Sequence, residues 1–141
     1  IAPGGGDPID FDILRCETQR NLSKEGITQS KNIGKFFLEN NIKIDKVLSS
    51  EWCRCKQTAQ YAFNLYETKS FLNSFFSEKF ASNKNKQIND LKKYINEWRG
   101  DNNLVLVTHY VTIQEVLNIT SSSGELIIAD KNFNVLARQN F

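Results

Sequence analysis

One stretch of sequence decides the fold: Asn103-Leu-Val-Leu-Val-Thr-His109. Its apolar run has the length and the β-branched content that are typical of a buried strand. Parallel α/β sheets bind ligands at the carboxyl ends of their strands, so the run predicts that His109 lies at such a crevice. His109 is the only histidine of the chain. Without this context it would as readily be an ordinary surface or core residue.

A second stretch places an arginine in a similar position. Residues 46–50 read as a short strand, and residues 51–59 open the helix behind it. Ser50 fits an N-cap, which puts Arg54 about one turn into the helix. The free amides of a helix start favour an anion, and a guanidinium adds forked donors for phosphate oxygens. The alternative is that Arg54 is solvated or pairs with a carboxylate.

Length and composition restrict the class of protein. A chain of 141 residues with 40% hydrophobic and 24% charged residues is typical of one globular domain, residues 1–141. The net charge of +2 indicates neither a nucleic-acid-binding surface nor a membrane-binding one. No run approaches the roughly 20 apolar residues of a membrane span.

Helical and extended patterns alternate along the chain. We expect helices over 23–39, 51–66, 84–99 and 111–117, strands over 44–49 and 104–108, and a closing β-hairpin of 124–129 with 134–139. Residues 71–76 are ambiguous between a strand end and an aromatic loop. The pattern predicts a three-layer α/β/α sandwich with a mostly parallel sheet and an antiparallel end. Residues 1–21 read as a loop, so the strand that should precede the first helix is missing.

Several motifs occur in an order that resembles a known family. Ser50-Glu-Trp-Cys-Arg54-x-x-x-Thr58, Val107-Thr-His109 and Asn21-Leu-Ser-x-x-Gly26 resemble segments of the histidine phosphatase superfamily, the phosphoglycerate mutase-like proteins. The Trp52-Cys-Arg-Cys55 motif and the Gly4-Gly-Gly-Asp-Pro8 loop are similar to a bacterial branch of that superfamily. The similarity extends over nearly the whole chain.

The resemblance implies a phosphomonoester hydrolase that works through phosphohistidine, without a cofactor or a metal. Arg54 would hold the phosphate and His109 would donate a hydrogen bond to a phosphoryl oxygen. Arg20 and Asn21 would border the same pocket. The protein would accelerate the reaction by positioning the phosphoryl group and by neutralising the charge on its oxygens.

The proton donor departs from the family pattern. The family carries an acid in a Leu-x-Glu segment, and the matching stretch here is Leu72-Asn-Ser74. Ser74 therefore stands in place of the carboxylate and would border the substrate. Glu78, four residues on, is a candidate substitute for the acid, although a surface carboxylate is the alternative reading. Trp52, Phe75 and Phe76 would form an aromatic rim or pack in the core.

The largest departure is the nucleophile. The family's Arg-His motif should fall immediately before Ile1, and neither residue is in this chain. His109 cannot both attack phosphorus and hold an equatorial oxygen. We therefore expect the motif and its strand upstream of Ile1 in the natural protein, and this chain, as a truncated domain, to be inactive.

Cysteine usage adds one structural expectation. Cys16, Cys53 and Cys55 are too few for a disulfide scaffold and lack the pairs of a structural zinc site. Cys55 should face the core. A bridge between Cys16 and one of the other two is expected if the protein is exported, as the resembled branch suggests; a periplasmic and a cytoplasmic location both stay open.

Two other functions stay open beside the phosphatase. A non-catalytic domain that binds a phospholigand fits the literal chain, and a phosphomutase fits the fold, although mutases usually carry longer insertions. The expected partner is a phosphorylated small molecule or a phosphoprotein, with no nucleic acid or membrane. The oligomeric state is left open.

Overall fold

The computed structural model describes residues 1–141 and has the expected alternation of elements. The helices are α1 (Lys24–Glu39), α2 (Cys53–Phe63), α3 (Lys84–Glu97) and α4 (Tyr110–Leu117), with short 3₁₀ turns at Cys16–Thr18, Ser70–Leu72 and Ala81–Asn83. The strands are β1 (Ile44–Ser49), β2 (Glu67–Thr68), β3 (Asn103–Val107), β4 (Leu126–Ala129) and β5 (Val135–Gln139). None of the helices combines the length and the apolar character needed to cross a membrane.

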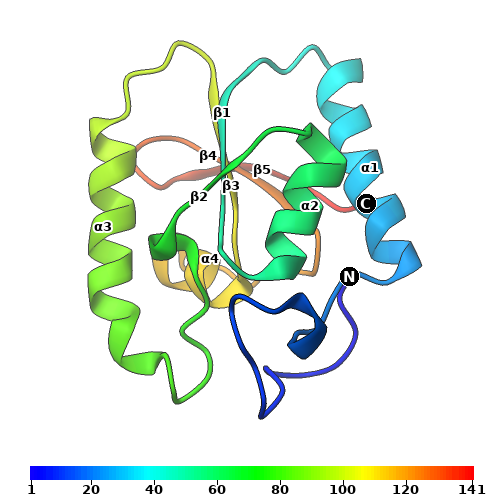
Figure 1. Ribbon diagram of the computed structural model, residues 1–141. Helices are drawn as coiled ribbons and strands as arrows, with labels where there is room; N and C mark the ends of the chain where they lie inside the picture. The colour runs from blue at the N-terminus through cyan, green and yellow to red at the C-terminus, as the bar shows by residue number, and fades with distance from the viewer.

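The strands form two sheets. The first is parallel in the order β2-β1-β3, with Ser49 of β1 opposite Val107 of β3. The second is the antiparallel hairpin β4-β5, as the sequence predicts. Helices α1 and α2 lie on one side of the parallel sheet and α3 and α4 on the other (Figure 1). The α/β fold with layered helices is therefore confirmed.

Helix α1 forms because its first turn is capped and one of its faces is apolar. The Ser23 hydroxyl accepts a hydrogen bond from the Gly26 amide at 3.0 Å, which satisfies one of the free donors of the first turn. Ile33 and Phe37, four residues apart, are buried. Gly34 lies between them, where a Cβ would collide with the backbone of Ala62 in α2. The two helices therefore cross at close range.

The main core lies between β1 and α3. Leu48 and Leu91 pack with Leu72, and all three are nearly inaccessible to solvent. The expected helix 51–66 is shorter at both ends. Trp52 rather than Ser50 occupies its N-cap position, and it ends at Phe63, where Asn64 takes a φ of +66°. The ambiguous residues 71–76 belong to a 3₁₀ turn and a loop, after the two-residue strand β2.

The facing edges of β3 and β4 have no strand partner. Strand β3 pairs with β1 alone and β4 pairs with β5 alone. Two cavities of about 550 and 610 Å³ lie between the two sheets, and residues of both β3 and β4 line each of them. Protein interiors are normally close-packed, so the unfilled space between β3 and β4 is unusual. We call this space the slot.

Candidate active site

Two neighbouring strand ends form the floor of the site. Ser50 follows β1 and His109 lies two residues beyond β3, where it is the N-cap residue of α4. The Ser50 amide donates a hydrogen bond to the Val107 carbonyl at 2.9 Å, which extends the strand pairing to this edge. The side chains of Ser50 and His109 therefore meet at the carboxyl edge of the parallel sheet, where such sheets bind ligands.

The hydrogen bonds around His109 determine which ring nitrogen carries the proton. Nδ1 lies 3.2 Å from Nη2 of Arg54, which can only donate, so Nδ1 accepts. Nε2 lies 2.8 Å from Ser50 Oγ and in the neutral ring must therefore be the protonated nitrogen. The Ser50 hydroxyl in turn donates to Oδ1 of Asn73 at 3.2 Å and accepts from the Trp52 amide at 3.1 Å. The imidazole is thus fixed in one orientation and one tautomer.

The charge state of His109 follows from its burial. Its exposed fraction is 7%. Loss of hydration lowers the pKa of His109 well below its usual 6.5, and the positive charges of Arg54 and Arg20 lower it further. His109 is therefore neutral at pH 7 while the pocket is empty.

Arg54 is the second residue of α2 and has unused hydrogen-bonding capacity. Its Nη1 is buried without a hydrogen-bond partner. The nearest opposite charge is Oδ1 of Asp7, 3.6 Å away, and both side chains are largely shielded from solvent. A buried donor without a hydrogen-bond partner raises the free energy of the folded protein. Arg54 is therefore well placed to bind an anion.

Arg20 lies beside Arg54 on a different segment. Its Nε donates to the Gly6 carbonyl at 2.7 Å, and its Nη1 donates to the carbonyls of Ala2 and Gly4 at 2.7 and 2.9 Å. Burial lowers the pKa of Arg20, the charge of Arg54 lowers it further, and Asp7 opposes both effects. Gly4 and Gly6 have φ values of +101° and +65°, which favour glycine, in the loop that turns its carbonyls toward the guanidinium.

Covalent and hydrogen bonds attach the segment that carries Arg20 to the start of α2. Cys16 and Cys53 form a disulfide, and the side chain of Gln19 accepts a hydrogen bond from the Cys53 amide at 2.9 Å. Farther along, the side chain of Gln57 accepts from the Leu22 amide at 3.1 Å. The bridge left open between Cys16 and one of two cysteines thus involves Cys53. It holds the two arginine-bearing segments together.

Cys55 is the remaining free cysteine, and it is buried as expected. Its Sγ lies 3.7 Å from Nε2 of His109 and 3.7 Å from the Thr108 carbonyl oxygen. Burial raises the pKa of the Cys55 thiol to about 11, although the nearby Arg54 charge acts in the opposite direction. The group is therefore an uncharged thiol under the histidine and a poor nucleophile at neutral pH.

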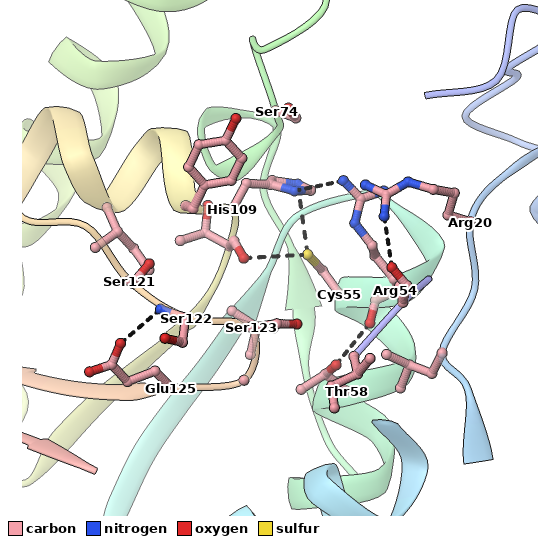
Figure 2. A pocket seen from close by; sticks show the side chains of 18 of the residues that line it. Arg20, Arg54, Cys55, Thr58, Ser74, His109, Ser121, Ser122, Ser123 and Glu125 are labelled. Atoms are coloured by element: carbon pink, nitrogen blue, oxygen red, sulfur yellow. Dashed lines mark hydrogen bonds between the residues drawn. The ribbon is translucent and has the colours of Figure 1, made fainter. Parts of the chain in front are cut away.

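Arg20, Arg54, Cys55 and His109 line the smaller of the two cavities described above, of about 550 Å³. Figure 2 shows Arg20 and Arg54 on one side of His109 and the Ser121–Ser123 loop on the other, with Cys55 below the imidazole. No group of three or more potential ligands lies close enough to hold a metal ion. Of the two carboxylates in the lining, Glu125 is paired with Arg138, so Arg20 and Arg54 facing Asp7 leave an excess of positive charge. The cavity therefore favours a small anion such as a phosphoryl group.

The structure brings together only some of the residues that the sequence singled out. Arg20, Arg54, Ser74 and His109 line this cavity. Asn21 is not among the lining residues; its side chain donates to the carbonyls of Cys16 and Gln19. Asn21 thus bonds to its own loop, and its Oδ1 accepts a hydrogen bond from Gln57 of α2 at 3.1 Å.

The structure does not bring Glu78 to the cavity. Glu78 is exposed and is absent from the lining. Ser74 is buried, and its Oγ accepts a hydrogen bond from the Phe76 amide at 3.2 Å. Of the three aromatic residues considered for a rim, Trp52 and Phe75 are buried and Phe76 is exposed. The segment 72–78 therefore contributes a hydroxyl and one aromatic side chain, but no carboxylate.

Sequence reasoning assigned neither acidic residue of the cavity lining, Asp7 and Glu125, to the site. The glycine-rich loop that ends in Asp-Pro was itself noticed. A loop without periodicity does not reveal which way its side chains point. Only the pairing of Asp7 with Arg54 in space identifies it as part of the pocket.

Comparisons with known proteins agree with this fold. Neither a protein-family profile nor a curated protein sequence matches the chain. Among solved structures, the protein histidine phosphatase SixA complexed with tungstate superposes with a TM-score of 0.60 at 16% identity, over 86% of this chain and 84% of that one. A phosphoglycerate mutase from Thermus thermophilus superposes with a TM-score of 0.64 at 14% identity, over 86% and 85%.

A third structure, TTHB049 from Thermus thermophilus, gives a TM-score of 0.61 at 14% identity, again over 86% of this chain and 85% of that one. The chain is thus an α/β protein with an arginine-lined crevice at the end of a parallel sheet. Its fold is the phosphoglycerate mutase-like fold, which it shares with the structures of SixA and of the phosphoglycerate mutase.

Proposed function

We propose that the full-length protein is a phosphomonoester hydrolase that acts through a phosphohistidine intermediate. The observation that carries this proposal is the convergence of Arg20, Arg54 and the neutral His109 in one cavity, where a buried Arg54 nitrogen lacks a hydrogen-bond partner. These donors suit the equatorial oxygens of a phosphoryl group. The fold is shared with a protein histidine phosphatase and a phosphoglycerate mutase.

In this proposal the two arginines and His109 have defined tasks. Arg54 and Arg20 bind the phosphoryl oxygens and neutralise the charge that develops on them. An incoming anion raises the basicity of His109 next to it, because it offsets the two guanidinium charges. His109 can then take up a proton and donate a hydrogen bond from Nδ1 to the bound oxygen.

The nucleophilic histidine is proposed to precede Ile1, on a strand that enters between β3 and β4. Two observations support this placement: the facing edges of these strands are unpaired, and the cavities between them extend along β3. A strand in this slot would end at the same sheet edge as His109. Its next residue would lie at the floor of the arginine-lined cavity.

Phosphate release from p-nitrophenyl phosphate tests the proposal. The full-length protein should hydrolyse this ester, and the protein that begins at Ile1 should not. The phosphoenzyme trapped during turnover should be stable to base and labile to acid, as a phosphoramidate is. In the full-length protein, Arg54→Ala should lower kcat/KM by about 10²–10³-fold, the usual cost of removing one oxyanion donor. Equal activity of the two lengths would contradict the assignment of the nucleophile.

Two other functions remain as alternatives. The present chain contains the anion-binding residues but only one histidine, which favours a domain that binds a phospholigand without turnover. Binding of phosphate or vanadate by the full-length protein, with no ester hydrolysis, would support that reading. The phosphoglycerate mutase superposes over 85% of its own length, so chain length does not separate a mutase from a phosphatase. Transfer of phosphate to a second hydroxyl, rather than to water, would identify a mutase.

A further inference from the structure

The pocket contains a carboxyl group to which the proposed function has not yet given a task. Asp7 lies in the glycine-rich loop, and its side chain is only 9% exposed. It lines the same cavity as His109, with Oδ1 3.6 Å from Nη1 of Arg54. A carboxylate in an anion-binding pocket repels the ligand, so its presence there calls for an explanation.

The two oxygens of Asp7 have different surroundings. Oδ1 accepts a hydrogen bond from the indole Nε1 of Trp52 at 3.1 Å. Trp52 is 1% exposed and is held by stacking on Phe11, with ring centroids 5.0 Å apart, and by an edge contact with His109 at 5.4 Å. Oδ2 takes part in no hydrogen bond and is not fully buried, and Asp7 is one of the residues that line the cavity. The carboxyl group is therefore oriented through one oxygen, and the other is free to carry a proton.

We propose that Asp7 is the general acid and base of the reaction. This inference rests on the proposed function and adds to it the proton donor that the segment 72–78 lacks. The hydroxyl of Ser74 is too weak an acid for this task, and Glu78 does not reach the cavity.

The proton balance is as follows. In the first step the histidine nitrogen forms a bond to phosphorus while the bond from phosphorus to the ester oxygen breaks. The electron pair goes to the ester oxygen, which takes the proton from Asp7 Oδ2, and the alcohol departs. In the second step water attacks phosphorus, the phosphorus–nitrogen bond breaks and Asp7 takes the proton from the water. Inorganic phosphate is released and the acid is restored.

A series of leaving groups separates this task from a structural one. p-Nitrophenolate leaves without needing a proton, whereas an alkoxide must be protonated. In the full-length protein, Asp7→Asn should therefore lower kcat for an alkyl phosphate by about 10²–10⁴-fold, the usual contribution of a general acid. The same variant should change kcat for p-nitrophenyl phosphate by less than about 10-fold, and the limb of the pH profile that reports the acid should disappear.

Two matched variants complete the design. Asp10→Asn removes a carboxylate from the exposed part of the same loop and should leave both substrates unaffected. Glu78→Gln tests the rival donor. Vanadate binding and Tm show that Asp7→Asn is folded and retains its anion site.

Each outcome of these measurements supports or contradicts the assignment of Asp7 as the general acid and base. Equal losses for both esters would make Asp7 a residue that positions Arg54, and no loss for either ester would remove it from the mechanism. If Glu78→Gln lowers kcat for the alkyl ester more than for the aryl ester and Asp7→Asn does not, the general acid is Glu78. If the unsubstituted protein hydrolyses neither ester, the proposed function fails, and with it this inference. If only the Asp7 result fails, the phosphatase assignment stands.

Discussion

Nη2 of Arg54 lies 3.2 Å from Nδ1 of His109, and this contact joins the start of α2 to the end of β3. It makes two sequence motifs, about 55 residues apart, into one site. It also determines the tautomer of His109, because a guanidinium next to Nδ1 leaves Nε2 as the ring nitrogen that carries the proton. Anion binding by Arg54 and protonation of His109 are therefore coupled through this contact.

The first prediction concerns stability and pH. Burial and the two arginines lower the pKa of His109 in the folded protein, and its ordinary value is 6.5. Below about pH 6.5 the unfolded chain thus binds a proton that the folded chain does not. The free energy of unfolding should fall as pH is lowered from 6.5 to 5, by up to about 1.4 kcal/mol per pH unit from this residue.

Urea unfolding at several pH values measures this effect. His109 is the only histidine, so His109→Gln should remove this part of the slope while also lowering stability at pH 8 through loss of the Ser50 contact. Carboxylates titrate mainly below this range. Identical slopes in the two proteins between pH 6.5 and 5 would show that His109 is not held neutral.

The sequence predicted most of the fold because its signals were local. The boundaries of β1 and the start of α1 follow from an apolar run and a Ser23 cap, and both were placed within one residue. The start of α2 was placed too early, because Ser50 has the side chain of an N-cap but uses its hydroxyl to bind His109 and the Trp52 amide. A tertiary contact here outweighed the local capping preference.

The composition of the site was harder to predict than the fold. His109 and Arg54 each end or begin a regular element, and elements of a parallel sheet meet at one edge, so their proximity follows from topology. Asp7 and Glu78 lie in irregular segments, where the spacing of residues in the sequence does not predict the direction in which a side chain points. The placement of Asp7 depends on the long-range hydrogen bond from Trp52, 45 residues away.

The second prediction concerns the disulfide. Cys16 and Cys53 are 37 residues apart in sequence, and a cross-link of this loop length contributes about 3–4 kcal/mol by restricting the unfolded chain. Cys16→Ser combined with Cys53→Ser should lower the free energy of unfolding by roughly this amount. Vanadate binding by the full-length protein should weaken as well, because the bridge holds the segment of Arg20 against α2.

Dithiothreitol provides the control for this prediction. The reductant should lower Tm of the unsubstituted protein to that of the double variant, and it should not change Tm of the variant itself. If the reductant leaves both Tm and vanadate affinity of the unsubstituted protein unchanged, the bridge contributes neither to stability nor to the site.

The third prediction concerns the free thiol. Cys55 is buried and its pKa is raised to about 11, so little thiolate is present at pH 8. Iodoacetamide should therefore leave the folded protein unmodified. After unfolding in urea without reductant, mass spectrometry should find a single modified cysteine, Cys55. With reductant, all three cysteines should be modified. Rapid modification of Cys55 in the folded protein would show that the thiol below His109 is accessible and ionised.

The fourth prediction concerns the mouth of the pocket. Phe76 and Tyr110 both line the cavity, are 57% and 49% exposed, and have ring centroids 5.9 Å apart. Exposed aromatic side chains beside an anion site suit a leaving group with a flat apolar surface. An aromatic contact of this kind contributes about 0.5–1.5 kcal/mol. In the full-length protein, Phe76→Ala should thus raise KM for an aryl phosphate by about 2–10-fold and leave KM for a small alkyl phosphate unchanged.

Two further variants make this result specific. Phe76→Tyr keeps a ring at the mouth and should retain the affinity for the aryl ester. Leu136→Ala removes an exposed apolar side chain of β5 that is not among the cavity residues, and it should affect neither substrate. A rise in KM of the same size for both esters would mean that Phe76 supports the anion site through Ser74, whose Oγ accepts a hydrogen bond from the Phe76 amide. In that case the ring would not select the leaving group, and the specificity of the enzyme would reside elsewhere in the cavity.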